Sequence, residues 1–183
     1  MSDVGTIQSA DEYLRGILAR EEIDAGRRSP LRALKETVAA LCRELPGTML
    51  LGVHPTGAFE KGTANVSSVH IDFLASFAPT TVVPTGELFE AIFEVVTDAG
   101  YEAVRRDVSV ALMLGDIPVD IVPARREAMT TDVHEIWLSR HGRPVKSNLT
   151  QHILDLQASG RQEEIRVLKV WRDQHGLDFP SFY

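Results

Sequence analysis

The chain has 183 residues, enough for one well-cored globular domain, and its 44% hydrophobic and 25% charged residues are ordinary for such a domain. It has no apolar run long enough to span a membrane, no secretory pattern at its N-terminus, and a single cysteine, Cys42, which cannot form an internal disulfide. The formal net charge of −7 argues against a general electrostatic attraction to nucleic acid, so we expect a cytoplasmic protein that binds neither membranes nor DNA in general.

Two helices are expected near the N-terminus. The first covers residues 7–24, where Ser9 and Glu12 have the spacing of a capping box. The second covers residues 29–45, with Ser29 as N-cap and a proline in its first turn, and it ends before a Pro-Gly pair.

The middle of the chain predicts a set of strands around one helix. Short apolar runs between glycine and proline breakers indicate strands at 48–53, 69–77, 101–106, 108–114 and 118–122. Pro123 is expected to end the last of these. The helix covers residues 86–99, with Thr85 as its cap.

The last part of the chain predicts mainly loop and helix. Residues 127–148 are expected to be loop, with a possible short strand at 135–138, and two helices follow at 148–158 and 162–174. This order of elements predicts an α/β or α+β domain with a mixed sheet.

A turn that contains glycine follows the first strand at residues 54–58, and Lys61 and Thr63 lie just beyond it. Gly57 would permit a close approach to the backbone, so that turn amides and Lys61 could hold a triphosphate. An ordinary strand-to-helix turn is the alternative, and the glycine spacing alone does not decide between the two.

Two aspartates lie in apolar strand sequences, Asp72 in the second strand and Asp120 in a later one. Alternate residues of a strand point to one face, so His70 is expected on the same face as Asp72. Because an unpaired buried carboxylate is costly, the aspartates indicate a shared metal ion or basic partner. The alternative is that one of them pairs with an arginine such as Arg105 or Arg106.

Lys169 lies among apolar residues in the stretch EIRVLKVWRD. One interpretation is that it points inward, toward bound phosphates. The alternative is a solvated lysine on an amphipathic helix, which is the more common arrangement.

The resemblance to a known family is carried by GAFEKGTANVSSVHIDFLASF, by VDIVPA at 119–124, and by EIRVLKVWRDQHGLDFPSFY at the C-terminus. These stretches resemble nucleotidyltransferases of the DNA polymerase β type, and they are similar to the bacterial branch related to cyclic-oligonucleotide synthases and oligoadenylate synthetases. The resemblance covers nearly the whole chain.

The resemblance implies metal-dependent transfer of a nucleotidyl group from an NTP such as ATP to a hydroxyl, with release of pyrophosphate. The acceptor would be a nucleotide, or a hydroxyl of RNA or protein. Mg²⁺, or Mn²⁺, would be held by Asp72 and Asp120. The nucleotide would be bound by residues of the turn and of the C-terminal helix, namely Gly57, Ala58, Lys61, Thr63 and Lys169.

Two positions differ from the family pattern. Ala58 replaces the usual serine, which removes one phosphate hydrogen bond at a cost of roughly 1–2 kcal/mol. His70 stands at the usual first acidic position and brings no negative charge. We therefore expect little Mg²⁺-dependent activity. Open alternatives are a non-catalytic nucleotide-binding or antitoxin-like regulatory module, an altered form of an active enzyme, or use of Mn²⁺.

The resemblance also implies one nucleotidyltransferase-like domain over residues 1–183, with an α/β (α+β) fold in which helices flank a mixed sheet. Its parts would be N-terminal helices within 7–45, the sheet core at 48–138 and C-terminal helices at 148–175. In the family the segment FPSFY usually continues into a further helical domain that helps to cover the nucleotide. We expect a fragment or a minimal form that lacks it.

Overall fold

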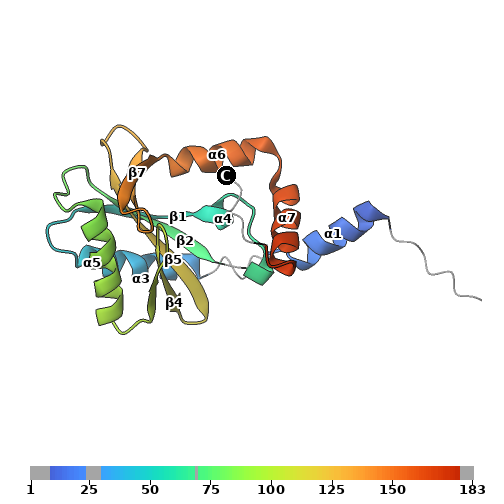
Figure 1. The fold of residues 1–183 in the computed structure, drawn as a ribbon, viewed down its shortest axis with the longest axis horizontal. Coiled ribbons are helices and arrows are strands. Elements are labelled where there is room, and N and C mark those ends of the chain that lie inside the picture. The colour runs from blue at the N-terminus through green and yellow to red at the C-terminus, as the bar shows by residue number, and fades with distance from the viewer. Residues whose placement is uncertain (1–8, 24–29, 69, 178–183) are drawn as a thin grey trace, which may run out of the picture.

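The computed structural model describes residues 9–23, 30–68 and 70–177. Its centre is a mixed sheet of seven strands, in which the order β1-β2-β5-β4-β3 forms the main path and β6 and β7 extend it beside β5 (Figure 1). β2 and β5 are parallel, and the other described pairs are antiparallel. The strands are β1 Leu50–Thr56, β2 Ile71–Phe77, β3 Ala103–Arg105, β4 Val110–Leu114, β5 Ile117–Arg126, β6 His134–Leu138 and β7 Arg143–Ser147.

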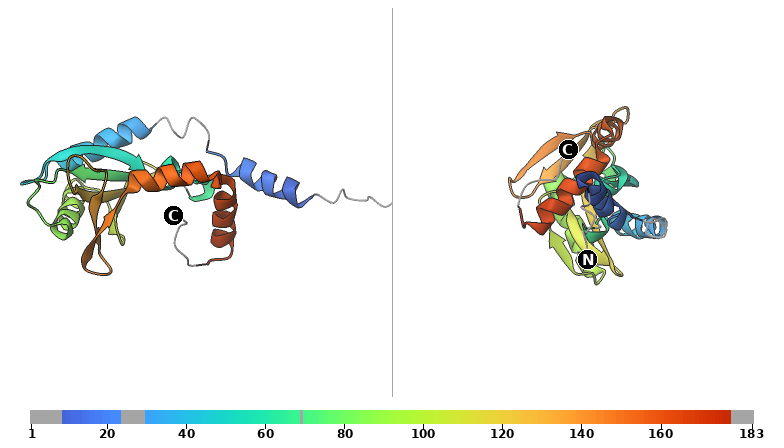
Figure 2. Two further views of the ribbon diagram at one scale, coloured as in Figure 1. Left: turned by 90° about the horizontal axis from the view of Figure 1, so that it is seen from above. Right: turned by 90° about the vertical axis from the view of Figure 1, so that its right-hand side faces the viewer.

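The described helices fall into two groups. α3 and α5 pack on the sheet and on each other, whereas α6, α7 and α1 follow one another away from it, with α7 running across the end of α6 (Figures 1 and 2). The short α4 belongs to neither group and lies against β1 and β2. None of the described helices is long and apolar enough to cross a membrane. The helices are α1 Ala10–Arg20, α3 Leu31–Arg43, α4 Gly57–Glu60, α5 Thr85–Asp98, α6 Leu149–Ser159 and α7 Gln162–Gln174.

The main hydrophobic core lies between α3, α5 and one face of the sheet. Phe73 and Phe77 of β2 are fully buried there, against helix residues such as Val38 and Leu88. These positions alternate along β2, as expected for a strand with one face on a core.

The intervening residues of β2 and β5 point to the opposite face. Leu74 and Val122 form a smaller cluster there with Ala124 and Ile136. Asp72 lies two residues before Leu74, and Asp120 lies two residues before Val122. Alternation therefore places both carboxylates on the face that α3 and α5 do not cover.

Most of the predicted elements are confirmed, with differences at their ends. The capping box of Ser9 and Glu12 is present, and the helix covers 10–20; of the predicted 7–24, residues 7, 8 and 24 lie outside the described residues. The predicted N-cap of the second helix, Ser29, lies outside the described residues, and this helix begins at Leu31. The prediction of Thr85 as a cap was wrong, because its hydroxyl donates to Glu135 of β6 at 3.0 Å.

Four of the described prolines lie within strands, namely Pro55, Pro118, Pro123 and Pro144, and the prediction that Pro123 ends its strand was wrong. β5 continues through Pro123 to Arg126, and β2 pairs with it there through Ala75. On the other side of β5, pairing with β4 ends at Ile121 and pairing with β6 begins at Ala124, so neither of these two strands pairs with Pro123. β1 likewise runs through Pro55, which an edge strand tolerates.

Two further differences concern the second half of the sheet and the start of β2. Residues 143–147, predicted as loop, form β7, which pairs with the predicted short strand β6. His70 precedes β2 rather than lying within it.

Candidate functional site

The parallel pairing of β2 and β5 brings Asp72 and Asp120 together. The two residues are direct partners in the register, and Thr56 of β1 lies opposite Asp72 on its other side. The prediction that these aspartates come from neighbouring strands is therefore confirmed. Neighbouring strands are about 4.8 Å apart, so two carboxylates in this arrangement repel each other unless cations compensate them.

A cavity of about 870 Å³ lies over this pair and contains all of the sequence-predicted site residues. Five cationic side chains and three carboxylates line it, so its formal charge is +2 while that of the whole chain is −7. The cationic residues are Lys61, Arg106, Lys146, Lys169 and Arg172, and the carboxylates are Asp72, Asp120 and Asp173.

The turn at Gly57 packs directly against Asp72. Gly57 has φ of +67°, and a Cβ atom there would lie 1.8 Å from the Oδ2 atom of Asp72, so only glycine fits. The backbone N–H of Ala58 donates a hydrogen bond to the Asp72 carboxylate. The Ala58 amide is one of the turn amides that were expected to hold phosphate, and here it is bonded to Asp72 instead.

Other amides of the same turn are also bonded within the protein. The N–H groups of Lys61, Gly62 and Thr63 donate to backbone carbonyls of residues 57–59. Binding of an anion here therefore depends on cationic side chains more than on these amides.

The Asp72 carboxylate is unusually hard to ionise. Burial, and then repulsion from Asp120, raise its pKa to about 7, while the Ala58 amide and the charges of Lys169 and Lys61 act in the opposite direction. A further positive charge close to Asp72 would stabilise its ionised form.

Asp120 is buried, with 5% of its surface exposed, and donors face both of its oxygen atoms. Oδ1 accepts a hydrogen bond from Ser109 Oγ at 3.0 Å and lies 3.4 Å from Nε of Arg106. Oδ2 lies 3.7 Å from Nδ1 of His70. The alternative of an arginine partner thus holds for Arg106, whereas Arg105 pairs with Glu90 of α5.

Lys169 of α7 points inward, with 6% of its surface exposed. Its ammonium group donates to the carbonyl and hydroxyl oxygens of Thr63 at 3.1 and 3.3 Å. Burial, followed by repulsion from Arg172 and Lys61, lowers its pKa to about 8. Burial also lowers the pKa of Lys61. Lys169 is thus a buried cation, a group that favours an anionic partner.

Some cavity residues were missed in the sequence. Arg172 lies three positions after Lys169, and this helical spacing could have placed both on one face of α7. Lys146, which also lines the cavity, and Ser109, which donates to Asp120, gave no comparable signal, because their positions depend on β7 and on the turn before β4.

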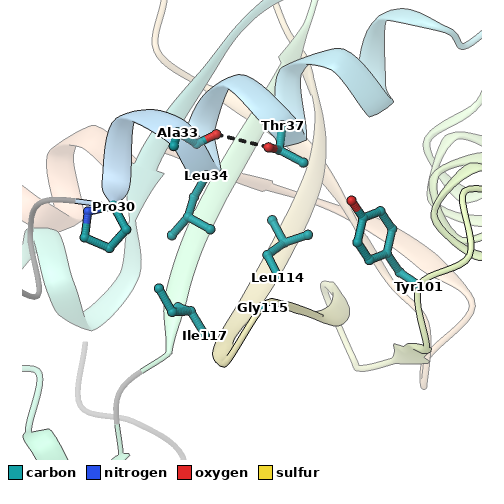
Figure 3. A pocket seen from close by; sticks show the side chains of 8 residues that line it. All are labelled: Pro30, Ala33, Leu34, Thr37, Tyr101, Leu114, Gly115 and Ile117. Carbon is teal, nitrogen blue, oxygen red and sulfur yellow. Dashed lines mark hydrogen bonds between the residues drawn. The ribbon is translucent and has the colours of Figure 1, made fainter.

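A second cavity, of about 330 Å³, lies between α3 and the turn that joins β4 to β5 (Figure 3). None of its eight lining residues is charged, and the hydroxyl of Thr37 is bonded to the carbonyl of Ala33 at 3.1 Å. Its polar side chains are those of Thr37 and Tyr101.

The donor set over β2 and β5 does not fit a two-metal centre. In the described part of the chain no three His, Cys, Asp or Glu side chains are grouped to hold a metal ion. Asp120 is already faced by Ser109, Arg106 and His70, and His70 offers nitrogen where the family pattern has a carboxylate. Mg²⁺ prefers hard oxygen ligands that carry negative charge.

No protein-family model matches the chain, and no curated protein matches it in sequence. Solved structures do match it in fold. CdnG, a CD-NTase of Bradyrhizobium diazoefficiens in complex with GTP, gives a TM-score of 0.66 at 18% identity, over 93% of this chain and 54% of its own. CdnC of E. coli MS115-1 with ATP gives a TM-score of 0.68 at 17% identity, over 93% of this chain and 59% of its own. CdnE of Rhodothermus marinus, a c-UMP-AMP synthase with Apcpp and Upnpp, gives a TM-score of 0.65 at 11% identity, over 93% of this chain and 72% of its own.

These matches establish that the chain has the nucleotidyltransferase fold seen in bacterial CD-NTases, which confirms the predicted fold class. The chain spans less than two thirds of the length of CdnG and CdnC. Fold similarity at this level of identity does not by itself carry their activities to this chain.

Proposed function

We propose that this chain binds a nucleoside triphosphate in the cavity over β2 and β5, with the triphosphate beside Lys61, Lys169 and Arg172. The observation that carries the proposal is the buried ammonium group of Lys169, which faces a cavity of net positive formal charge in an acidic chain. The fold supports it, because CdnG and CdnC were solved with GTP and ATP.

The volume of the cavity agrees with a ligand of this class. At about 870 Å³ it lies within the range of sites that enclose small molecules. Its wall also includes apolar side chains such as Val108, Val122 and Leu138, which offer a surface for the uncharged part of a nucleotide.

Nucleotide binding is tested by titrating ATP, GTP, CTP and UTP calorimetrically into the protein and into Lys169→Met. We expect at least one NTP to bind, and Lys169→Met to weaken it about tenfold or more, the loss expected for a charge-assisted hydrogen bond. Lys35→Met, the same change at an exposed position on α3, is the control and should leave the affinity within about twofold. Absence of binding by every NTP would overturn the proposal.

For turnover, the site supports weak transfer of a nucleotidyl group to a hydroxyl, with pyrophosphate as the leaving group. Asp72 and Asp120 are the candidate ligands for Mg²⁺ or Mn²⁺, and His70 leaves this set one carboxylate short. The same observation favours a second candidate function, a non-catalytic nucleotide-binding or regulatory module.

The two candidates are separated by nucleotide incorporation in the protein and in His70→Asp, each with Mg²⁺ and with Mn²⁺. We expect His70→Asp to be the more active form in Mg²⁺ by about tenfold or more, because a third carboxylate adds an oxygen ligand and a negative charge. Equal Mg²⁺ activity in both forms would contradict this role for His70. No incorporation by either form, with NTP binding intact, would favour the regulatory module.

A further inference from the structure

Arg106 lies between the buried Asp120 and the cavity. Its Nε atom lies 3.4 Å from Oδ1 of Asp120, which is one of the two carboxylates expected to hold metal. Half of the Arg106 side chain is exposed, and it lines the cavity. The guanidinium group is therefore in contact with the buried acid and with the space into which a ligand enters.

The backbone around Arg106 is held firmly from two directions. Its N–H donates to the carbonyl of Ser109 at 2.8 Å, and its carbonyl accepts from the hydroxyl of Ser139 at 2.8 Å. The next residue, Asp107, is bonded through its own carbonyl and carboxylate to the backbone of residues 139–140. These bonds hold the backbone from which the Arg106 side chain reaches Asp120.

The contact with Asp120 uses the Nε atom. Among the described residues, the two terminal nitrogens of Arg106 make no hydrogen bond within the protein. A guanidinium group has five donors in one plane, so it can meet a carboxylate on one edge and a phosphate on another.

A divalent cation would have to compete with these groups for Asp120. Ser109 already donates to Oδ1, and the fixed positive charge of Arg106 repels a second cation at this distance. Of the two consecutive arginines, Arg106 faces Asp120, whereas Arg105 pairs with Glu90 on α5.

We propose that Arg106 stands in for a metal ion: it neutralises Asp120 and offers its terminal nitrogens to a phosphate, so the cavity binds the triphosphate of an NTP without a divalent cation. This inference rests on the proposed nucleotide-binding function. It concerns binding and makes no statement about transfer.

The first test measures the affinity of the tightest-binding NTP in EDTA and in Mg²⁺. The protein should bind equally well in both, within about twofold, and Arg106→Gln should lose about tenfold or more in EDTA. Arg105→Gln is the matched control, because its side chain is exposed to a similar degree but pairs away from the cavity, and it should bind as the parent does.

The second test measures binding of Mn²⁺ alone, without nucleotide, by electron paramagnetic resonance. The parent and Arg105→Gln should bind Mn²⁺ weakly, and Arg106→Gln should bind it about tenfold more tightly because the competing charge is gone. Thermal unfolding of each variant verifies that it is folded.

The outcomes separate this inference from the proposed function. NTP binding that requires Mg²⁺ would overturn the inference and leave the proposed function intact. Equal Mn²⁺ affinities of the parent and Arg106→Gln would also overturn it. If no NTP binds in either buffer, both fail.

Discussion

At the scale of single residues, Gly57 is a position at which the structure excludes any side chain. A side chain there would meet the Asp72 carboxylate in space and would also be strained by the positive φ. Gly62 shares the positive φ, +72°, but a Cβ atom there would lie 3.6 Å from the nearest neighbour, Cγ of Gln162, an ordinary contact. The pair separates the effect of strain from the effect of close approach.

Gly57→Ala should therefore lower the free energy of unfolding more than Gly62→Ala does. We expect Gly62→Ala to cost about 1–2 kcal/mol from backbone strain, and Gly57→Ala to cost at least about 1 kcal/mol more from the displacement of Asp72. Urea denaturation measures both. Gly57→Ala should also weaken NTP binding, because it would displace the turn that contains Ala58 and Lys61. Equal losses of stability in the two variants would show that the contact with Asp72 is unimportant.

At the scale of elements, α7 holds the segment that follows α4. Asn65 is fully buried, and its side chain donates to the carbonyl of Arg166 at 2.9 Å and accepts from Nε of Arg166 at 3.1 Å. Arg166 also donates to the carbonyl of Leu18 on α1 at 3.0 Å. One arginine of α7 thus connects three elements, and Lys169 joins the same segment one turn later through Thr63.

Arg166→Ala tests this connection. It would leave the buried amide oxygen of Asn65 without its donor, which should cost about 1–3 kcal/mol in the free energy of unfolding. NTP affinity should fall severalfold as well, because the segment that carries Lys61 and Thr63 would no longer be fixed to α7. Both quantities come from denaturation and calorimetry.

Arg161→Ala is the control for this change. Arg161 lies at the start of the same helix, where it is largely exposed and pairs with Glu164, so its loss should cost less than about 0.5 kcal/mol. Similar losses of stability in the two variants would contradict the connecting role of Arg166.

At the scale of the whole molecule, much of the fold follows from local patterns. Alternation along β2 and β5 separates the phenylalanines of the core from Asp72 and Asp120, and capping and helical spacing locate most of the helices. What could not be predicted depends on long-range pairing. β5 continues past Pro123 because its neighbours change there, and the polar residues of β7 form a strand because β6 lies beside them.

The candidate site, like the fold, has parts that could be predicted from the sequence and parts that could not. The turn, the two aspartates and Lys169 were visible in the sequence as separate features, and the structure places all of them around one cavity. The partner of Asp120 was left open between two consecutive arginines. Only the turn from Arg106 to Ser109 determines which of them faces the acid.

The parallel pairing of β2 with β5 has a consequence for how the site comes into being. Asp72 and Asp120 are partners in the register but are separated along the chain by α5 and by β3 and β4. Closing so long a connection costs chain entropy, and pairings of this kind form late in folding. A proteolytic fragment that ends before β5 would keep the glycine turn, Lys61 and Asp72 but would lack Asp120 and Lys169. The site is thus assembled only when the two halves of the sheet join, and unfolding that separates them abolishes it at once.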